Sequence, residues 1–368
     1  MSYQPGRLGL AEGIALVFAT TLAPIFLTIF PASVDAAGPA AWMRPVISFI
    51  EFLVILYLLL YVLKNTTGDL YAACQQLLGT TLTRLVALYY TSLYFLDAGL
   101  LLRQFAENTL LTALPRLEFE VAIGLYAIMA VFLLYFGLEA MARTCYIILP
   151  FAVAGLLAIM ALAAPRYEFF HLTPWVGPGL GQVFIWGVQA GGINLGALLP
   201  FLIAASFQNA PTIRNAVLYG LGLSTLMRTL AFIAYTTAFG VSVGREKVLP
   251  FFDLARLVYI NRFLQRIEAF FIILWTAMGM LNVAIDIYAG LYLLCRLFNL
   301  PSLRPFILPT TLIIAELAML PHEITGVLTF YNQAIFSFYN LGTIVIPLML
   351  FIAAVYRAKR GREKCRSV

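Results

Sequence analysis

Residues Leu180 to Phe207 contain no charged side chain, and the stretch Gly187 to Pro200 within them reads GVQAGGINLGALLP. A run of this length can cross a bilayer as a helix. The stretch Gly187 to Pro200 nevertheless holds four glycines and a proline, which are the residues that disfavour a helix most. At membrane depth, non-helical backbone survives only where protein or a wet cavity satisfies its polar groups. The run therefore predicts an interrupted membrane helix.

Composition places this run in a membrane protein with many spans. The 368 residues are 62% hydrophobic and 11% charged, whereas soluble domains are roughly 45–50% apolar and about 25% charged. Most apolar runs reach the roughly 17–25 residues that a span needs. We predict an all-α polytopic protein with about ten transmembrane helices, near 10–30, 46–63, 85–102, 121–138, 144–164, 180–207, 216–243, 269–295, 306–321 and 333–356.

The order of the runs suggests two repeats within one permease-like domain, residues 1–356. Repeat one covers about 10–164 and repeat two about 180–356. Because each repeat has an odd number of spans, five, the two repeats must have opposite orientations in the membrane. The tail, residues 357–368, carries six Lys or Arg residues. Basic residues near span ends favour the cytoplasmic side, so both termini are expected there. The net charge of +6 predicts contact of this tail with anionic lipid rather than with nucleic acid.

Catalytic and metal-binding signatures are not found in the sequence. The four cysteines form no close pair, and His171 and His322 do not form a metal-ligand spacing. No phosphate-binding loop, dinucleotide fingerprint or nucleophile elbow occurs. We therefore expect no enzyme activity, no cofactor and no metal.

A second interruption is predicted in the first span, where TTLAPIFLTIFP contains Pro24, a residue that breaks the helical hydrogen-bond ladder. Spans one and six occupy corresponding positions in two five-helix repeats. Matching interrupted spans in two halves indicate a transporter-type ligand site. The alternative is close helix packing alone, because Gly187 and Gly191, like Gly192 and Gly196, are four residues apart.

Polar residues within the apolar runs extend this site. Tyr90, Tyr94 and Asp97 share one helical face, and Asp286 lies one turn from Asn282. They either line a cavity or pair structurally with neighbouring spans. Buried Arg228 needs a partner, for which Glu51 and Asp286 are the candidates, in a gating or a structural role. The predicted ligand site comprises Ala23, Pro24, Tyr94, Asp97, Gln189, Gly191, Gly192 and Asn194, and the predicted coupling or gating residues are Glu51, Arg228, Asn282 and Asp286.

The segment Leu249 to Glu268 has apolar residues at helical spacing. It predicts an amphipathic helix on the outer face, which would either cover the site or simply anchor at the interface.

Three segments resemble the spore germination permease family, the B-type membrane subunits of nutrient germinant receptors. They are FGLEAMARTCYIILP (Phe136 to Pro150), HLTPWVGPGLGQVF (His171 to Phe184) and LPFFDLARLVYINRFLQRIEAFFIILW (Leu249 to Trp275). The resemblance implies a LeuT-like fold of inverted five-helix repeats with helices 1 and 6 discontinuous. It also implies a sensor of small nutrients, often amino acids, in the inner membrane of the endospore, acting with A-type and C-type subunits.

One departure keeps rival functions open. The family's first span usually carries a glycine-rich break, whereas this chain reads LAPIFLTIF there, which leaves less room for a ligand carboxylate. A more apolar germinant, or a scaffold subunit that no longer binds one, also fits. A secondary transporter of amino acids, with Asp97, Glu51 or Asp286 coupling transport to H⁺ or Na⁺, would use the same site.

Overall fold

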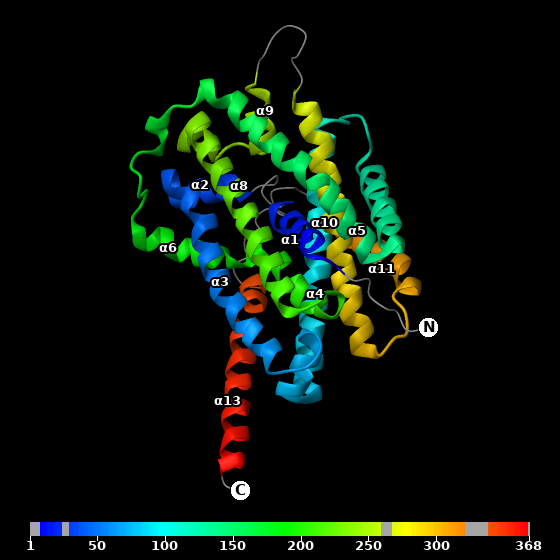
Figure 1. The fold of residues 1–368 in the computed structure, drawn as a ribbon. Coiled ribbons are helices and arrows are strands. Elements are labelled where there is room, and N and C mark those ends of the chain that lie inside the picture. The colour runs from blue at the N-terminus through cyan, green and yellow to red at the C-terminus, as the bar shows by residue number, and fades with distance from the viewer. Residues whose placement is uncertain (1–7, 24–28, 259–266, 321–337, 367–368) are drawn as a thin grey trace.

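The computed structural model describes residues 8–23, 29–258, 267–320 and 338–366. These residues form helices and loops, and the one β-type pairing among them is an isolated bridge between Leu8 and Phe207. The prediction of an all-α protein is therefore confirmed (Figure 1). The α-helices are α1 (Leu10–Leu22), α2 (Ile29–Ala37), α3 (Met43–Lys64), α4 (Leu70–Thr112), α5 (Phe119–Ala163), α6 (Leu180–Gln189), α7 (Leu199–Leu202), α8 (Ala210–Gly244), α9 (Pro250–Arg256), α10 (Ile267–Phe298), α11 (Arg304–Met319) and α13 (Ile346–Arg366).

Within the described residues, seven helical segments are long and apolar enough to cross a membrane. The sequence predicted about ten runs, more than these seven segments, because two of the runs lie in one continuous helix and others form helices that are too short. Helix α5 contains both the 121–138 and the 144–164 run, whereas α1 has 13 residues and α11 has 16. The last predicted run, 333–356, is described only from residue 338 onward.

The two runs in α5 are joined at Gly137, whose backbone angles are φ 84° and ψ 175°. This region of backbone space is essentially restricted to glycine because a β-carbon would clash there. Gly79 turns α4 in the same way, with φ 78° and ψ 178°. In both helices, a bend at a single glycine therefore replaces a loop.

The first predicted run, 10–30, covers α1 and reaches the first two residues of α2, and residues 24–28 lie between these two helices in the sequence. Pro24, the predicted breaking residue, lies outside the described residues, and buried Ala23 caps the end of α1. Helix α1 packs against α8 and against the segment that follows α6. A β-carbon on Gly196 in that segment would meet Thr20 of α1. Helix α1 therefore contacts the segment that follows α6, as a shared site requires.

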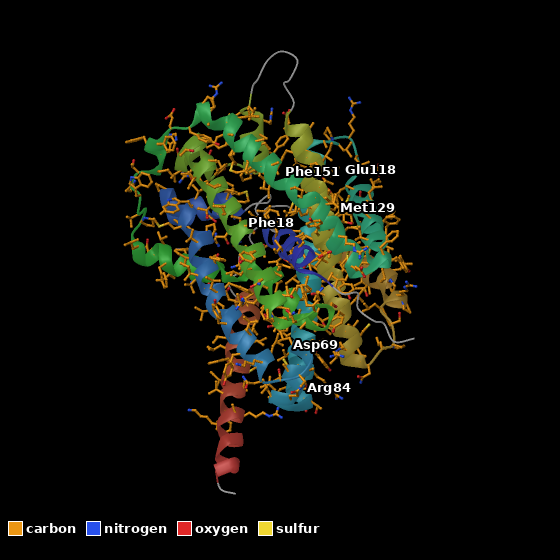
Figure 2. All side chains as sticks on the ribbon, in the orientation of Figure 1. Phe18, Asp69, Arg84, Glu118, Met129 and Phe151 are labelled. Carbon is orange, nitrogen blue, oxygen red and sulfur yellow. The ribbon has the colours of Figure 1, made fainter. Side chains whose placement is uncertain are left out.

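Exposed apolar side chains cover the outside of the bundle. Phe18 is 1% exposed and lies in the interior, whereas Met129 and Phe151 on α5 are 42% and 58% exposed (Figure 2). Large exposed apolar side chains also occur on α3, α4, α8 and α11. A surface of this kind is stable against lipid rather than water, and the chain is therefore a multi-pass membrane protein.

The segment predicted as one amphipathic helix, Leu249 to Glu268, is interrupted in the structure. Its described parts are α9, which ends at Arg256, and the first residues of α10, while residues 259–266 lie outside the described residues. Helix α9 packs against α5, α8 and α10. It lies at the end of the molecule opposite the C terminus of α13 (Figure 1).

The bend in α5 yields a stability prediction. Gly137→Ala should destabilise the protein by about 1–3 kcal/mol because alanine is strained at this φ and ψ. Gly124→Ala, in the same helix and with no atom within 4 Å of the added β-carbon, should be neutral or stabilising. Thermal unfolding of the purified variants in detergent compares them, and equal stability of the two would contradict this account of the bend.

Candidate functional site

The sixth predicted span changes helix type at its centre. Helix α6 ends at Gln189, residues Ala190–Leu198 wind as a 3₁₀-helix (η5), and α7 resumes the α-helix at Leu199. Asn194 departs furthest from helical geometry, with φ −88° and ψ 19°. Runs of 3₁₀-helix this long are uncommon and often mark strained or functional sites. The interruption therefore begins at the predicted glycine pair, although the chain tightens there rather than uncoiling.

The side chain of Asn340 satisfies backbone groups at the start of η5. The Gly192 N–H donates to Asn340 Oδ1 at 2.7 Å, and Asn340 Nδ2 donates to the Gln189 carbonyl at 2.7 Å. These two backbone groups are three residues apart, the spacing that a 3₁₀ turn pairs directly. The carboxamide thus bridges one turn of the interrupted helix, and we call this arrangement the Asn340 clasp.

The neighbouring glycines allow close packing, as the alternative interpretation predicted. A β-carbon on Gly187 would meet Ile47 of α3, and one on Gly191 would meet the Glu51 carboxylate one turn further along the same helix. The spacing of four residues is therefore used for helix contact. Gly192 has a different role, because its backbone N–H enters the clasp.

Asn194 connects η5 to two other helices. It is fully buried, its Nδ2 donates to the Ser48 carbonyl of α3 at 3.1 Å, and its Oδ1 accepts from Arg228 Nη2 of α8 at 2.9 Å. Arg228 also donates to Thr225 Oγ1 at 3.3 Å. The predicted carboxylate partners of Arg228, Glu51 and Asp286, are thus wrong, since no described carboxylate lies within 4.0 Å of its guanidinium.

The surroundings of Asn194 are positively charged. Arg228 is 4% exposed, and Arg44 of α3 is 5% exposed and donates to Ser33 Oγ. The charge of Arg44 acts on Arg228 across the contact between α3 and α8. The Nε atom of Arg228 has no hydrogen-bond partner among the described residues. A buried guanidinium held only by neutral groups favours the approach of an anion.

The predicted face of α4 reaches two neighbours. Tyr94 donates to the Leu195 carbonyl in η5 at 3.4 Å, while Asp97 Oδ1 accepts from Tyr339 at 2.6 Å. The Asp97 carboxyl also lies within hydrogen-bonding reach of Asp286 on α10. Tyr94 of α4 therefore contacts the interrupted helix, whereas Asp97 faces α10 and the segment before α13.

The remaining predicted residues are distributed around this region. Gln189 is exposed and contributes its backbone carbonyl to the clasp. Glu51 is half-buried, and its Oε2 has no hydrogen-bond partner among the described residues. Asn282 is 1% exposed, and both of its amide atoms likewise have none.

Sequence reasoning missed Tyr339 and Asn340. Both lie in the predicted run 333–356, where the letters YNLG stand in a mainly apolar sequence. Tyr339 and Asn340 are hydrogen-bonding residues near a glycine at membrane depth, as is Asn194. Polar residues in such a position indicate a functional site. Weighing every polar residue within the apolar runs would have found it.

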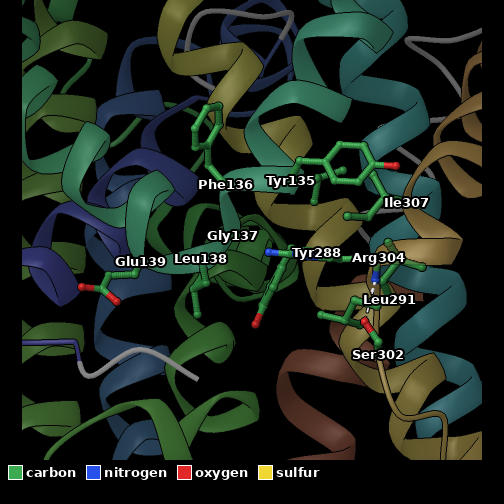
Figure 3. A pocket seen from close by; sticks show the side chains of 12 residues that line it. Tyr135, Phe136, Gly137, Leu138, Glu139, Tyr288, Leu291, Ser302, Arg304 and Ile307 are labelled. Carbon is green, nitrogen blue, oxygen red and sulfur yellow. Dashed lines mark hydrogen bonds between the residues drawn. The ribbon is translucent and has the colours of Figure 1, made fainter. Parts of the chain in front are cut away.

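A pocket of about 190 Å³ lies elsewhere, at the bend of α5 (Figure 3). It is formed where Gly137 and Glu139 meet α10 and the start of α11, and the Arg304 N–H donates to Ser302 Oγ at 3.3 Å. None of the predicted site residues lines it. The segment Phe136 to Pro150, which resembles the spore germination permease family, thus begins at the bend of α5 and does not belong to the interrupted helix.

Comparison with known proteins agrees with the resemblance seen in the sequence. A family model described as "Spore germination protein" matches residues 7–327. Two relatives from Bacillus subtilis (strain 168) are 21% identical: spore germination protein KB, over 92% of each chain, and spore germination protein A2, over 96% of this chain and 97% of its own.

Solved transporter structures share the fold. MhsT in complex with L-phenylalanine superposes with a TM-score of 0.68 at 15% identity, covering 94% of this chain and 89% of MhsT. Mhp1, a nucleobase-cation-symport-1 family transporter in a closed conformation, gives 0.62 at 14% identity, over 92% of this chain and 81% of its own. The predicted LeuT-like fold is thereby confirmed.

The Asn194 bridge yields a second prediction. Asn194→Ala should destabilise the protein by about 1.5–3 kcal/mol, because it removes a hydrogen-bond acceptor from a buried charged group. Asn194→Asp retains an acceptor for Arg228 and should cost less. Asn65→Ala, which removes an exposed side-chain hydrogen bond to the Tyr61 carbonyl, should change stability by about 0.5 kcal/mol or less. Chemical unfolding in detergent orders the three variants, and an Asn194→Ala protein as stable as Asn65→Ala would disprove the role of the bridge.

Proposed function

Because the chain belongs to the spore germination protein family, we propose that it is the membrane subunit of a nutrient germinant receptor. A small nutrient binds at the interrupted helix formed by α6, η5 and α7, and its binding triggers germination. The observation that carries this proposal is the Asn340 clasp, in which a side-chain carboxamide holds a backbone N–H and a backbone carbonyl at the start of η5. A small polar ligand would use the same two groups.

Ligand binding then acts by displacement. A carboxylate or amide on the nutrient accepts from Gly192 N–H in place of Asn340 Oδ1, and Asn340 leaves the Gln189 carbonyl. The released side chain is continuous with the π-helical segment Leu341–Val345 and with α13. The ligand thus favours the conformation in which this segment has separated from η5, and it shifts the balance between the two states.

The charge of the site favours a nutrient with an anionic group. Arg228 lies beside Asn194 and is hydrogen-bonded to neutral partners among the described residues. A ligand carboxylate would add a charge-assisted hydrogen bond to this buried guanidinium. An amino acid or a similar small acid therefore fits, and Tyr94 contacts the same segment at the Leu195 carbonyl.

The cellular setting follows from the same proposal. The receptor subunit lies in the inner membrane of the endospore, acts with A-type and C-type subunits and has both termini in the cytoplasm. Its two repeats span about 10–164 and 180–356, and the basic tail from residue 357 contacts anionic lipid.

Removal of the clasp tests the displacement step. Two neutral hydrogen bonds are worth about 1–3 kcal/mol net, so Asn340→Ala should lower the nutrient concentration for half-maximal germination by about tenfold. Asn340→Asp keeps the acceptor for Gly192 and loses the donor, and it should lie between wild type and Asn340→Ala. The measurement is the dose–response of spores that carry each variant as their only copy.

Two controls accompany this experiment. Asn65→Ala, at an exposed helix end, should leave the dose–response unchanged. Immunoblots of spore membranes establish equal amounts of each variant. If Asn340→Ala spores require more nutrient than wild type, Asn340 is itself a ligand contact and the displacement mechanism is refuted.

The preference for an anionic ligand is tested on the purified protein. Each amino acid that stabilises the wild type against heat should do so at about tenfold lower concentration than its amide, which lacks the carboxylate charge. Arg228→Met should abolish this difference, whereas Arg228→Lys should retain part of it. Equal potency of acid and amide on the wild type would exclude recognition of the carboxylate by Arg228.

A secondary transporter is the rival function, and the fold shared with MhsT and Mhp1 favours it. Liposomes containing only this subunit separate the two functions. A receptor subunit should bind the nutrient without accumulating it, whereas a transporter should accumulate labelled amino acid when an H⁺ or Na⁺ gradient is imposed.

A further inference from the structure

Helices α4 and α10 pack side by side along much of their length. A β-carbon on Gly290 would meet the Phe95 ring, and one on Gly279 would meet the Phe105 ring. Positions rise along α4 as they fall along α10, so the two helices run antiparallel. Asp97 and Asp286 lie between these two glycine contacts and are 8% and 2% exposed.

The two carboxyls lie within hydrogen-bonding reach of each other. Asp97 Oδ1 also accepts from the Tyr339 hydroxyl at 2.6 Å, whereas Asp286 Oδ2 has no hydrogen-bond partner within the described part of the chain. Two buried carboxylates this close cannot both be ionised. We propose that Asp97 and Asp286 form one proton-binding site, in which a single exchangeable proton joins α4 to α10.

A second observation supports a polar guest at this interface. Asn282 lies one turn from Asp286 on α10, and Gln104 lies two turns from Asp97 on α4. Both side chains are 1% exposed, and neither amide has a hydrogen-bond partner among the described residues. Buried amides are almost always hydrogen-bonded. The antiparallel register brings these two residues to the same part of the interface, so they continue the polar contact along the two helices.

The surrounding groups favour a proton over a metal ion. Tyr94 of α4 and Tyr339 are the described titratable groups that face the two carboxyls, and no Lys, Arg or His nitrogen lies within 4.0 Å of either among the described residues. The described residues also contain no group of three or more His, Cys, Asp or Glu suited to a metal. A hard cation requires several oxygen ligands around it, whereas a proton requires only the two carboxyls.

Occupancy of the site affects the region of the clasp. Tyr339 donates to Asp97, and the next residue, Asn340, holds η5. Loss of the proton leaves two adjacent negative charges, which push α4 and α10 apart and alter the acceptor of Tyr339. The proton site itself does not depend on the proposed function, although this consequence for the clasp does.

The test measures thermal stability of the full-length protein in detergent, from mildly acidic to mildly alkaline buffer. Two adjacent carboxylates repel each other when both are ionised, so the stability that the shared proton gives is present at lower pH and is lost as pH rises. The apparent melting temperature of the wild type should fall by about 2–4 °C across this range. Asp286→Asn, whose amide cannot ionise but can still donate to Asp97, should remove this fall.

Two further variants sharpen the result. Glu246→Gln removes an exposed carboxylate and should keep the wild-type pH dependence. Tyr339→Phe removes a hydrogen-bond donor that favours the charged form of Asp97, so the proton is held more tightly. The loss of thermal stability should then occur at higher pH than in the wild type. Asp97→Asn, the reciprocal variant, should also flatten the pH profile. It replaces Asp286→Asn in the test if the Asp286→Asn protein does not fold.

The outcomes decide the proposal. A wild-type stability that does not fall towards alkaline pH overturns it without any variant. Parallel profiles for the wild type and both Asp→Asn variants overturn it as well. If added Na⁺ or K⁺, but not choline, restores the alkaline stability of the wild type and not of Asp286→Asn, the site holds a metal cation and the assignment to a proton is wrong.

Discussion

The structure depends on satisfying backbone hydrogen bonds where no bulk water is present. A helix interrupted in a bilayer leaves N–H and carbonyl groups that cost several kcal/mol each when unpaired. Here the interruption stays tightly wound as a 3₁₀-helix, and the groups at its start are held by the carboxamide of Asn340. This solution makes the interrupted helix dependent on a distant segment of the chain, because Asn340 lies 148 residues after Gly192.

That segment is itself held by α4. Tyr90 donates to the Gly342 carbonyl at 2.7 Å, Tyr89 donates to the Phe338 carbonyl, and Tyr339 donates to Asp97. The π-helical turn Leu341–Val345 has a wider hydrogen-bond spacing than an α-helix, and such turns are frequent at functional sites. Residues 338–345 are thus fixed by side-chain hydrogen bonds on two sides, to α4 and to η5. A change at either contact alters the same short element, which links η5 to the carboxyl pair.

The sequence allowed prediction of the elements whose determinants are local. Uninterrupted apolar runs predicted the spans, and Gly191 with Gly192 predicted where the sixth span changes its winding. The bend at Gly137 was not predicted, because a residue with positive φ leaves no trace in hydropathy. The partner of Arg228 was predicted wrongly. Buried charges were expected to pair with opposite charges, and this expectation overlooks a neutral amide as the partner. Asn194 satisfies the guanidinium through its carbonyl oxygen, and that choice depends on how α3, α8 and η5 meet in three dimensions.

The buried guanidinium of Arg228 and the buried carboxyl of Asp286 lie apart from each other in the bundle. Arg228 on α8 faces α3 and η5, whereas Asp286 on α10 faces α4. The interrupted helix contacts Arg228 through the neutral side chain of Asn194 and contacts α4 through the hydroxyl of Tyr94. A direct ion pair between them would neutralise each charge permanently and would fix the helices that carry them. Held apart, the guanidinium keeps its attraction for an anion, and the carboxyl pair keeps its need for a proton. Two buried charges that nearby residues do not cancel are expensive to fold, and their cost is offset when a mobile ligand or proton supplies the missing charge. The proposed function and the proposed proton site each supply such a charge, the first as a ligand carboxylate beside Arg228 and the second as a proton between Asp97 and Asp286.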